Sequence, residues 1–188
     1  MTDLLTAAGL GAMRGERLLF TGLSVTVAPG EVLLLRGANG AGKTTLLRLL
    51  AGLIPIEAGT LERSVPTHWV GHADGIKPHE TPRQHLTLWT EAWGGNPVAP
   101  AIDALGLARA ADVPARGLSA GQRRRTALAR LLLEDRPLWF LDEPFSALDA
   151  AGSDAVAGLI TGHRANGGAI IAAVHGSVPI TGARELTL

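Results

Sequence analysis

The sequence predicts an α/β fold: a mainly parallel β-sheet with helices on both faces, an antiparallel β edge, and an α-helical subdomain inserted into this core. Short apolar runs, such as LWFL at 138–141 and AIIAAV at 169–174, are typical of strands buried on both faces, and helical patterns separate them. The stretch 74–135 differs because it is more polar, and Pro78, Pro82, Pro97 and Pro114 divide it into helical pieces. The order of these patterns indicates a helical lobe inserted between two parts of a sheet.

Each element follows from its local pattern. Residues 18–28 alternate loosely between polar and apolar side chains and precede Pro29-Gly30, which predicts an antiparallel edge pair of strands. The leucines of 44–53 recur at helical spacing and predict a helix. Buried strands are expected at 31–37, near 65–70, at 136–144, at 167–175 and in the tail 182–188.

The 188 residues predict a single domain, 1–188, with a core lobe of about 1–73 and 136–188 and a helical lobe of about 74–135. The 17 basic residues balance 17 acidic ones, and this zero net charge disfavours a dedicated nucleic-acid binder. The absence of cysteine from the sequence excludes disulfides, thiolate metal sites and thiol nucleophiles.

Neither of two segments carries a targeting or membrane signal. The first 14 residues carry an acid at position 3 and no early basic residue, so they do not predict a signal peptide. The uncharged stretch 165–183 is interrupted by Gly, Asn, His, Ser and Pro, so it does not predict a membrane span.

Residues 37–45 (GANGAGKTT) match G-x-x-x-x-G-K-[ST] between a predicted strand and a predicted helix, the context that this pattern requires. The glycines let backbone N–H groups turn toward phosphate oxygens, and the helix N-terminus adds its positive dipole end. Lys43, one of only two lysines, is expected to reach the β- and γ-phosphates of a nucleotide, and the Thr44 hydroxyl to bind Mg²⁺. The predicted phosphate-binding residues are Gly37, Ala38, Asn39, Gly40, Ala41, Gly42, Lys43, Thr44 and Thr45.

Two consecutive acids end the apolar run at 138–141. Asp142 is expected to hold Mg²⁺ through water, and Glu143 to orient and deprotonate an attacking water molecule. The alternative is a strand that merely ends in an acidic turn. Two adjacent acids fit hydrolysis better than simple nucleotide sensing.

Residues 118–125 (LSAGQRRR) combine a helix start with three arginines. Ser119 and Gln122 match the S-x-x-Q capping box and predict a helix from 120 to about 134. The N-terminus of this helix is a second anion site, which makes sense if two chains pair head to tail and each closes the other's nucleotide. Since three consecutive arginines cannot share one helix face, we expect some to be solvated and others to line the nucleotide or a subunit contact.

The order of GANGAGKT, LSAGQ, LWFLDEP, SALD and a histidine after a strand resembles the ATP-binding subunit of ABC transporters over nearly the whole chain. The resemblance implies a P-loop NTPase core, in which Ser119 and Gly121 contact the γ-phosphate bound by the opposite subunit. It places Asp149 at the dimer seam and lets His175 hydrogen-bond the γ-phosphate as a catalytic residue, unless His175 is only a polar strand end. The family most often has LSGGQ, and Ala120 replaces the first glycine here.

Two positions depart from the family pattern. Counting from the neighbouring strand, His72 occupies the place of a family glutamine, whereas Gln84 falls too far inside the helical lobe. Imidazole is a poor Mg²⁺ ligand, so His72 is expected to act on the metal through water or to sense the γ-phosphate, unless it is an ordinary loop histidine. Arg14 stands where the family has an aromatic residue, and its guanidinium stacked on the base implies weaker selection of adenine.

The sequences GHADGIK and LSAGQRRR, the exchange at Arg14 and the short tail resemble one branch of the family, the ATPases of bacterial haem exporters that serve cytochrome c maturation. This resemblance implies ATP and Mg²⁺ as cofactors, and a second copy of the chain in a nucleotide-sandwich dimer. It implies integral membrane permease subunits as partners, docked on the loop from His72 to about Trp93, and indirectly a haem chaperone. The chain is then peripheral, at the cytoplasmic face of the inner membrane, with no nucleic-acid partner.

Other functions remain open. The chain can serve another small ABC exporter, or act as a soluble ABC ATPase on ribosomes or DNA, although such proteins generally have tandem cassettes or long insertions. A P-loop kinase would lack LSAGQ and would not need Glu143 as a base. The six histidines are dispersed and form no recognisable haem-ligand pattern, so a haem cargo is expected to be bound by the membrane partner or the chaperone.

Overall fold

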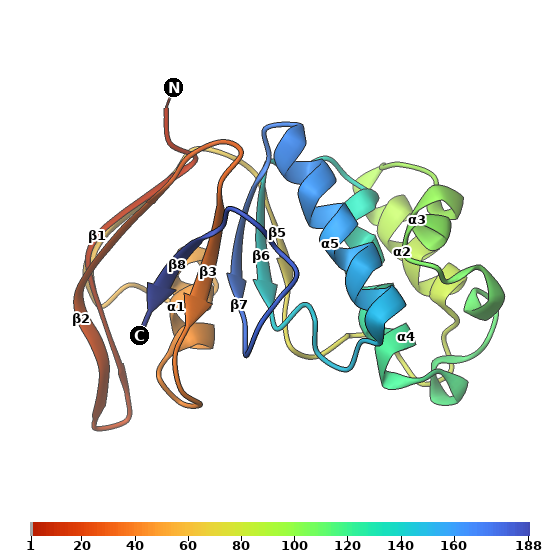
Figure 1. Ribbon diagram of the computed structural model, residues 1–188, viewed down its shortest axis with the longest axis horizontal. Coiled ribbons are helices and arrows are strands. Elements are labelled where there is room, and N and C mark those ends of the chain that lie inside the picture. The colour runs from red at the N-terminus through yellow and green to blue at the C-terminus, as the bar shows by residue number, and fades with distance from the viewer. Residues whose placement is uncertain (1) are drawn as a thin grey trace.

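A parallel sheet forms the centre of the computed structural model, which describes residues 2–188 (Figure 1). Its strand order is β5-β6-β7-β3-β8, and every neighbouring pair is parallel. All residues of β6 and β7 are buried, because helices cover both faces. The strands are β3 (Val32–Arg36), β5 (Thr67–Val70), β6 (Leu138–Asp142), β7 (Ala169–Ala173) and β8 (Arg184–Thr187).

A second, antiparallel sheet lies at the opposite end of the molecule from the helical lobe (Figure 1). It has the order β2-β1-β4, from β1 (Leu5–Arg14), β2 (Arg17–Val27) and β4 (Ala58–Arg63). The prediction of a strand pair within 18–28 is wrong, since this segment is the single strand β2 and its partner is β1. The hairpin turns at Gly15-Glu16, where Gly15 has a left-handed φ of 61°.

Alternate side chains of the parallel sheet pack on different helices. Leu33 and Leu35 of β3 share a core cluster with leucines of α1 (Lys43–Leu50). Leu34, between them, belongs to the other cluster, together with Val156 of α5 (Ala150–Ala165). This period of two places one helix on each face and brings the start of α1 to the carboxyl end of β3.

The helical lobe lies between β5 and β6 in the chain and packs beside α5 (Figure 1). The helix predicted for 120–134 ends earlier as an α-helix and continues as a 3₁₀ turn. Within residues 2–188, the structure contains no helix long and apolar enough to span a membrane. The elements of the lobe are α2 (Pro82–Trp93), α3 (Val98–Ala104), η1 (Ala108–Ala110), η2 (Ala115–Gly117), α4 (Ala120–Ala129) and η3 (Arg130–Leu132).

Candidate active site

The sheet order brings three polar side chains together at one edge. Strands β5, β6 and β7 are neighbours and parallel, so their carboxyl ends lie side by side. His72, Glu143 and His175 follow these three strands within two positions. In an open parallel sheet, this edge is where ligands bind.

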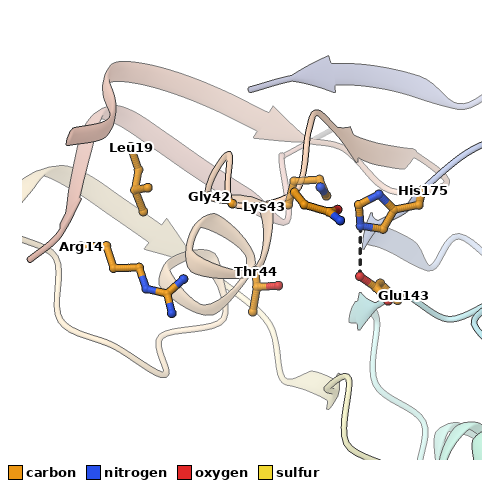
Figure 2. A pocket seen from close by; sticks show the side chains of 9 residues that line it. Arg14, Leu19, Gly42, Lys43, Thr44, Glu143 and His175 are labelled. Carbon is orange, nitrogen blue, oxygen red and sulfur yellow. Dashed lines mark ion pairs between the residues drawn. The ribbon is translucent and has the colours of Figure 1, made fainter. Parts of the chain in front are cut away.

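A cavity of about 300 Å³ lies at this edge, and Figure 2 shows the side chains around it. The glycine-rich loop, Glu143, His175 and Arg14 all contribute to its wall, although they come from distant parts of the chain. Leu19 of β2 also lines the cavity, and no pattern in the sequence distinguished it. The lining residues are Arg14, Leu19, Asn39, Gly40, Gly42, Lys43, Thr44, Glu143 and His175.

The glycine-rich loop wraps around the N-terminus of α1. Gly37, Gly40 and Gly42 have φ of 136°, 78° and 108°, which side chains other than glycine rarely adopt. A Cβ at Gly42 would also lie 3.3 Å from both Leu19 Cβ and Phe20 Cδ1. The tight turn therefore depends on glycine. It places the start of α1 at the cavity wall, where the first N–H groups of the helix, which have no partner within the helix, can bind an anion.

Lys43 is nearly buried, and its ammonium group donates to the carbonyl oxygens of Gly37 at 2.8 Å and Ala38 at 3.0 Å. These bonds hold the lysine across the loop with its charge beside the cavity. A cation and several backbone donors around one hollow can bind a polyphosphate.

The Thr44 hydroxyl lies 3.1 Å from both carboxylate oxygens of Asp142, which is almost fully buried. Hydroxyl and carboxylate oxygens are the hard ligands that Mg²⁺ prefers, so this pair fits a magnesium ion bound with a nucleotide. The two residues are separated by 98 positions, and the fold alone brings them together.

The carboxylate of Glu143 lies between two imidazoles. His175 Nε2 is 3.1 Å from Oε1, the contact dashed in Figure 2, and His72 Nδ1 is 3.2 Å from Oε2. Glu143 has a left-handed φ of 54°, which turns its side chain out of the β6 direction toward the cavity. His72 was expected to act near Mg²⁺ or the γ-phosphate, and this role stays a prediction; its contact in the structure is with Glu143.

Ser119 and Gln122 form the predicted capping box: Ser119 Oγ accepts from Gln122 N at 3.1 Å, and Gln122 Oε1 accepts from Ser119 N at 2.8 Å. A Cβ at Gly121 would lie 2.7 Å from the Ala147 carbonyl oxygen, so the start of α4 packs tightly on the loop before Asp149. Asp149 caps α5 by accepting from Gly152 N at 2.8 Å. These segments therefore form one continuous surface.

The predicted site residues thus fall on two surfaces. Within the described residues 2–188, Ser119, Gly121, Gln122 and Asp149 do not line the cavity at the phosphate loop. Their contacts with a nucleotide in a second copy of the chain remain a prediction. Ala120 is exposed, so the exchange from the family's glycine leaves the packing of Gly121 unchanged.

Within residues 2–188, none of the three arginines of RRR lines the cavity at the phosphate loop, and the expected contact of some of them with a second subunit stays a prediction. Arg123 donates to the Leu118 carbonyl at 2.6 Å, and Arg125 donates to the Leu105 carbonyl at 2.9 Å. Arg124 is buried and donates to the carbonyls of Gly71 and Asp142. The three side chains are partly or fully buried because the carbonyls that end neighbouring elements need donors.

Fold and site together define a nucleotide-binding P-loop ATPase. The family model described as "ABC transporter" matches residues 20–146, and the chain therefore belongs to the ABC transporter family, as an ATP-hydrolysing subunit. The "Cytochrome c biogenesis ATP-binding export protein CcmA" of Hyphomonas neptunium is 60% identical over 98% of this chain and 96% of that protein. The protein of the same name from Rhodopseudomonas palustris is 48% identical over 98% of this chain and 97% of that protein.

A solved ATP-binding subunit of an ABC transporter has the same fold. It superimposes with a TM-score of 0.80 at 23% identity, over 92% of this chain and 79% of that one. The predicted fold class is thereby confirmed: a P-loop NTPase core with a mainly parallel sheet, an antiparallel edge and an inserted helical subdomain.

Proposed function

We propose that this chain is the ATPase of an inner-membrane haem exporter that serves cytochrome c maturation, and that hydrolysis is coupled to release of a haem-loaded chaperone. The observation that carries the ATPase part is the placement of Glu143 at the cavity wall that Lys43 and Thr44 also form. The cytochrome c part is supported by the 60% identity to the CcmA protein of Hyphomonas neptunium.

In the proposed mechanism, ATP is the substrate and its phosphates enter the glycine-rich loop. Backbone N–H groups of the loop and Lys43 bind the β- and γ-phosphate oxygens, and Arg14 stacks on the base. Thr44, and Asp142 through water, hold Mg²⁺, which neutralises negative charge on the phosphates when it is bound. The loop and helix α1 thereby position the γ-phosphate opposite Glu143.

Glu143 acts as the base. Its carboxylate accepts a proton from a water molecule whose oxygen attacks the γ-phosphorus, and the bond from that phosphorus to the ADP oxygen breaks. His175, whose Nε2 lies 3.1 Å from Glu143 Oε1, orients the carboxylate and donates to the γ-phosphate. Buried Asp142 stays beside Thr44 throughout and is not the base.

The second surface completes the site in a dimer. Ser119 and Gly121 of one copy, at the N-terminus of α4 with Gln122, contact the γ-phosphate bound by the other copy, with Asp149 at the seam. The nucleotide thus bridges both chains and closes them; hydrolysis removes the bridge and lets them open. The segment from His72 to about Trp93, a loop followed by α2, docks on a membrane permease subunit, which receives this motion.

The test is the Glu143→Gln variant. Glutamine cannot accept the proton, so we expect ATP hydrolysis to fall by about 10³-fold while nucleotide affinity is retained. Phosphate release and nucleotide titration measure the two effects. Turnover within a few-fold of the unmodified chain would remove Glu143 from the mechanism.

The same variant, tagged and purified from detergent-solubilised membranes, identifies the partners by mass spectrometry. Small polytopic membrane subunits together with a haem-binding chaperone support the haem exporter. A different permease would keep the ATPase mechanism and reject haem export. Ribosomal or DNA-repair proteins would reject a transport role altogether.

A further inference from the structure

Arg124 connects the start of α4 to the edge of the sheet that carries the candidate active site. It lies on α4, five positions after the N-cap Ser119, and its side chain is buried. Nη1 donates to the Gly71 carbonyl at 2.7 Å and lies 3.4 Å from Asp74 Oδ1, and Nη2 donates to the Asp142 carbonyl. One guanidinium therefore hydrogen-bonds the backbone at the carboxyl ends of both β5 and β6.

The residues that Arg124 holds are the immediate neighbours of two site residues. Gly71 precedes His72 and Asp142 precedes Glu143. A planar guanidinium with several fixed donors can bridge two carbonyls in one geometry, which the single ammonium of a lysine does less well. The separation between the His72 and Glu143 backbones is thus set by a residue of α4.

His72 in turn touches the base. Its Nδ1 lies 3.2 Å from Glu143 Oε2, while His175 Nε2 lies 3.1 Å from Oε1, so each carboxylate oxygen has one imidazole beside it. The two imidazoles approach the carboxylate from opposite loops and restrict its rotation. Each oxygen still has a lone pair with which to accept a proton from water.

We propose that His72 is a positioning residue for Glu143, and that Arg124 sets the distance between them, so that α4 controls the orientation of the base. The proposal rests on the proposed role of Glu143 in ATP hydrolysis. A shift of α4, when Ser119 meets the nucleotide of a second copy, moves Arg124 and with it the pair His72–Glu143. Hydrolysis is thereby tied to closure of the dimer.

The first experiment compares His72→Asn and His72→Phe in the full chain, purified with its membrane partners. Asparagine places a donor near the position of Nδ1, whereas phenylalanine keeps the ring and loses the donor. The His72 side chain is 69% exposed, so neither change should unfold the protein. We expect kcat to fall about tenfold or more in His72→Phe, because the base is less well oriented, and to stay within a few-fold in His72→Asn. KM for ATP and Tm should change little in either variant.

The second experiment tests the connection by a double-mutant cycle in kcat. Arg124→Gln should lower kcat, and it should add little further loss when His72→Phe is already present, because both act on the same carboxylate. Arg125→Gln is the matched control, since within residues 2–188 Arg125 donates hydrogen bonds only to carbonyls of the helical lobe, those of Leu105 and Gly106, and should leave kcat unchanged. If Arg124→Gln does not fold, Arg124→Lys replaces it in the cycle.

Three outcomes overturn the proposal: an unchanged kcat in His72→Phe, an equal loss in His72→Asn, or additive losses for the His72 and Arg124 substitutions. These differ from failure of the proposed function. If the unmodified chain does not hydrolyse ATP, or if Glu143→Gln hydrolyses it normally, the proposed base itself is wrong.

Discussion

Glu143 and Ala147 both have left-handed backbone conformations, with φ of 54° and 60°, in the loop between β6 and α5. A residue with a Cβ pays about 1 kcal/mol or more for this conformation. At Glu143 a hydrogen bond offsets this cost, because its N–H donates to the Ala173 carbonyl at 2.9 Å, and one histidine lies beside each carboxylate oxygen. At Ala147 the side chain is exposed, while the carbonyl packs on Gly121.

This difference predicts that Ala147→Gly stabilises the protein. Glycine adopts a φ of 60° without steric cost, so the free energy of unfolding should rise by up to about 1 kcal/mol. The matched control is Ala157→Gly inside α5, where glycine should lower it by about 0.5–1 kcal/mol. Denaturant titration of the three proteins measures both effects. A lower free energy of unfolding for Ala147→Gly would show that the left-handed backbone of Ala147 does not destabilise the protein.

Two helices of the lobe begin with the same capping box, and only one belongs to the candidate site. Thr81 and Gln84 cap α2, and Ser119 and Gln122 cap α4. The bonds are closely similar, since the hydroxyl accepts from the third residue's N–H at 3.2 Å in α2 and 3.1 Å in α4. Gln84 is therefore a helix cap rather than a substitute for the family's glutamine.

Substitutions at these two caps distinguish an effect on stability from an effect on ATP hydrolysis. Ser119→Ala and Thr81→Ala should each lower the free energy of unfolding by about 1 kcal/mol through loss of the cap. We expect only Ser119→Ala to lower kcat for ATP strongly, because its hydroxyl is proposed to contact the second copy's nucleotide. Thermal unfolding and phosphate release are measured on the same samples. Equal kcat for the two variants would remove Ser119 from the nucleotide site.

The elements that escaped prediction have weak local patterns. Strand β1 contains Gly9 and Gly11, and α5 contains Gly152, Gly158 and Gly162. Glycine lowers both strand and helix propensity, so tertiary packing decides these segments. Strand β4 is mostly exposed and lacks an apolar run, and its pairing with β1 depends on contacts far away in the sequence.

At the scale of the whole molecule, three histidines are largely buried, and burial makes their imidazoles harder to protonate. Burial lowers the pKa of His68, of His85 and of His163 below 6.5. Hydrogen bonds to the Glu134 carbonyl and to Glu80 oppose this for His68 and His85 without reversing it. In the unfolded chain these side chains titrate near their ordinary value of about 6.5.

The sign of the pH dependence follows from these directions. Above pH 6.5 the three side chains are neutral in both states, so their full contribution to stability is present. As the pH falls below that value, these histidines become protonated in the unfolded chain while they are still neutral in the folded chain. The free energy of unfolding therefore decreases. We expect Tm to be lower at about pH 5.5 than at about pH 7.5.

His68→Gln is the control for this pH dependence. Glutamine can keep the hydrogen bond that His68 Nε2 makes to the Glu134 carbonyl at 2.8 Å, but it does not titrate. The change in Tm between the two pH values should therefore be smaller in this variant. A Tm that rises on acidification of the unmodified chain would contradict the prediction.

The sequence by itself determined the features that depend on neighbouring residues: the glycine-rich loop at 37–45, the acids that end β6, and the capping box at Ser119. Each is specified by a short spacing of residue types, which local backbone geometry converts into one conformation. Only the tertiary structure decided that His72 lies beside Glu143 and that Arg124 is buried between their loops. Those contacts depend on the order β5-β6-β7 and on the placement of α4, which packing of the whole core selects.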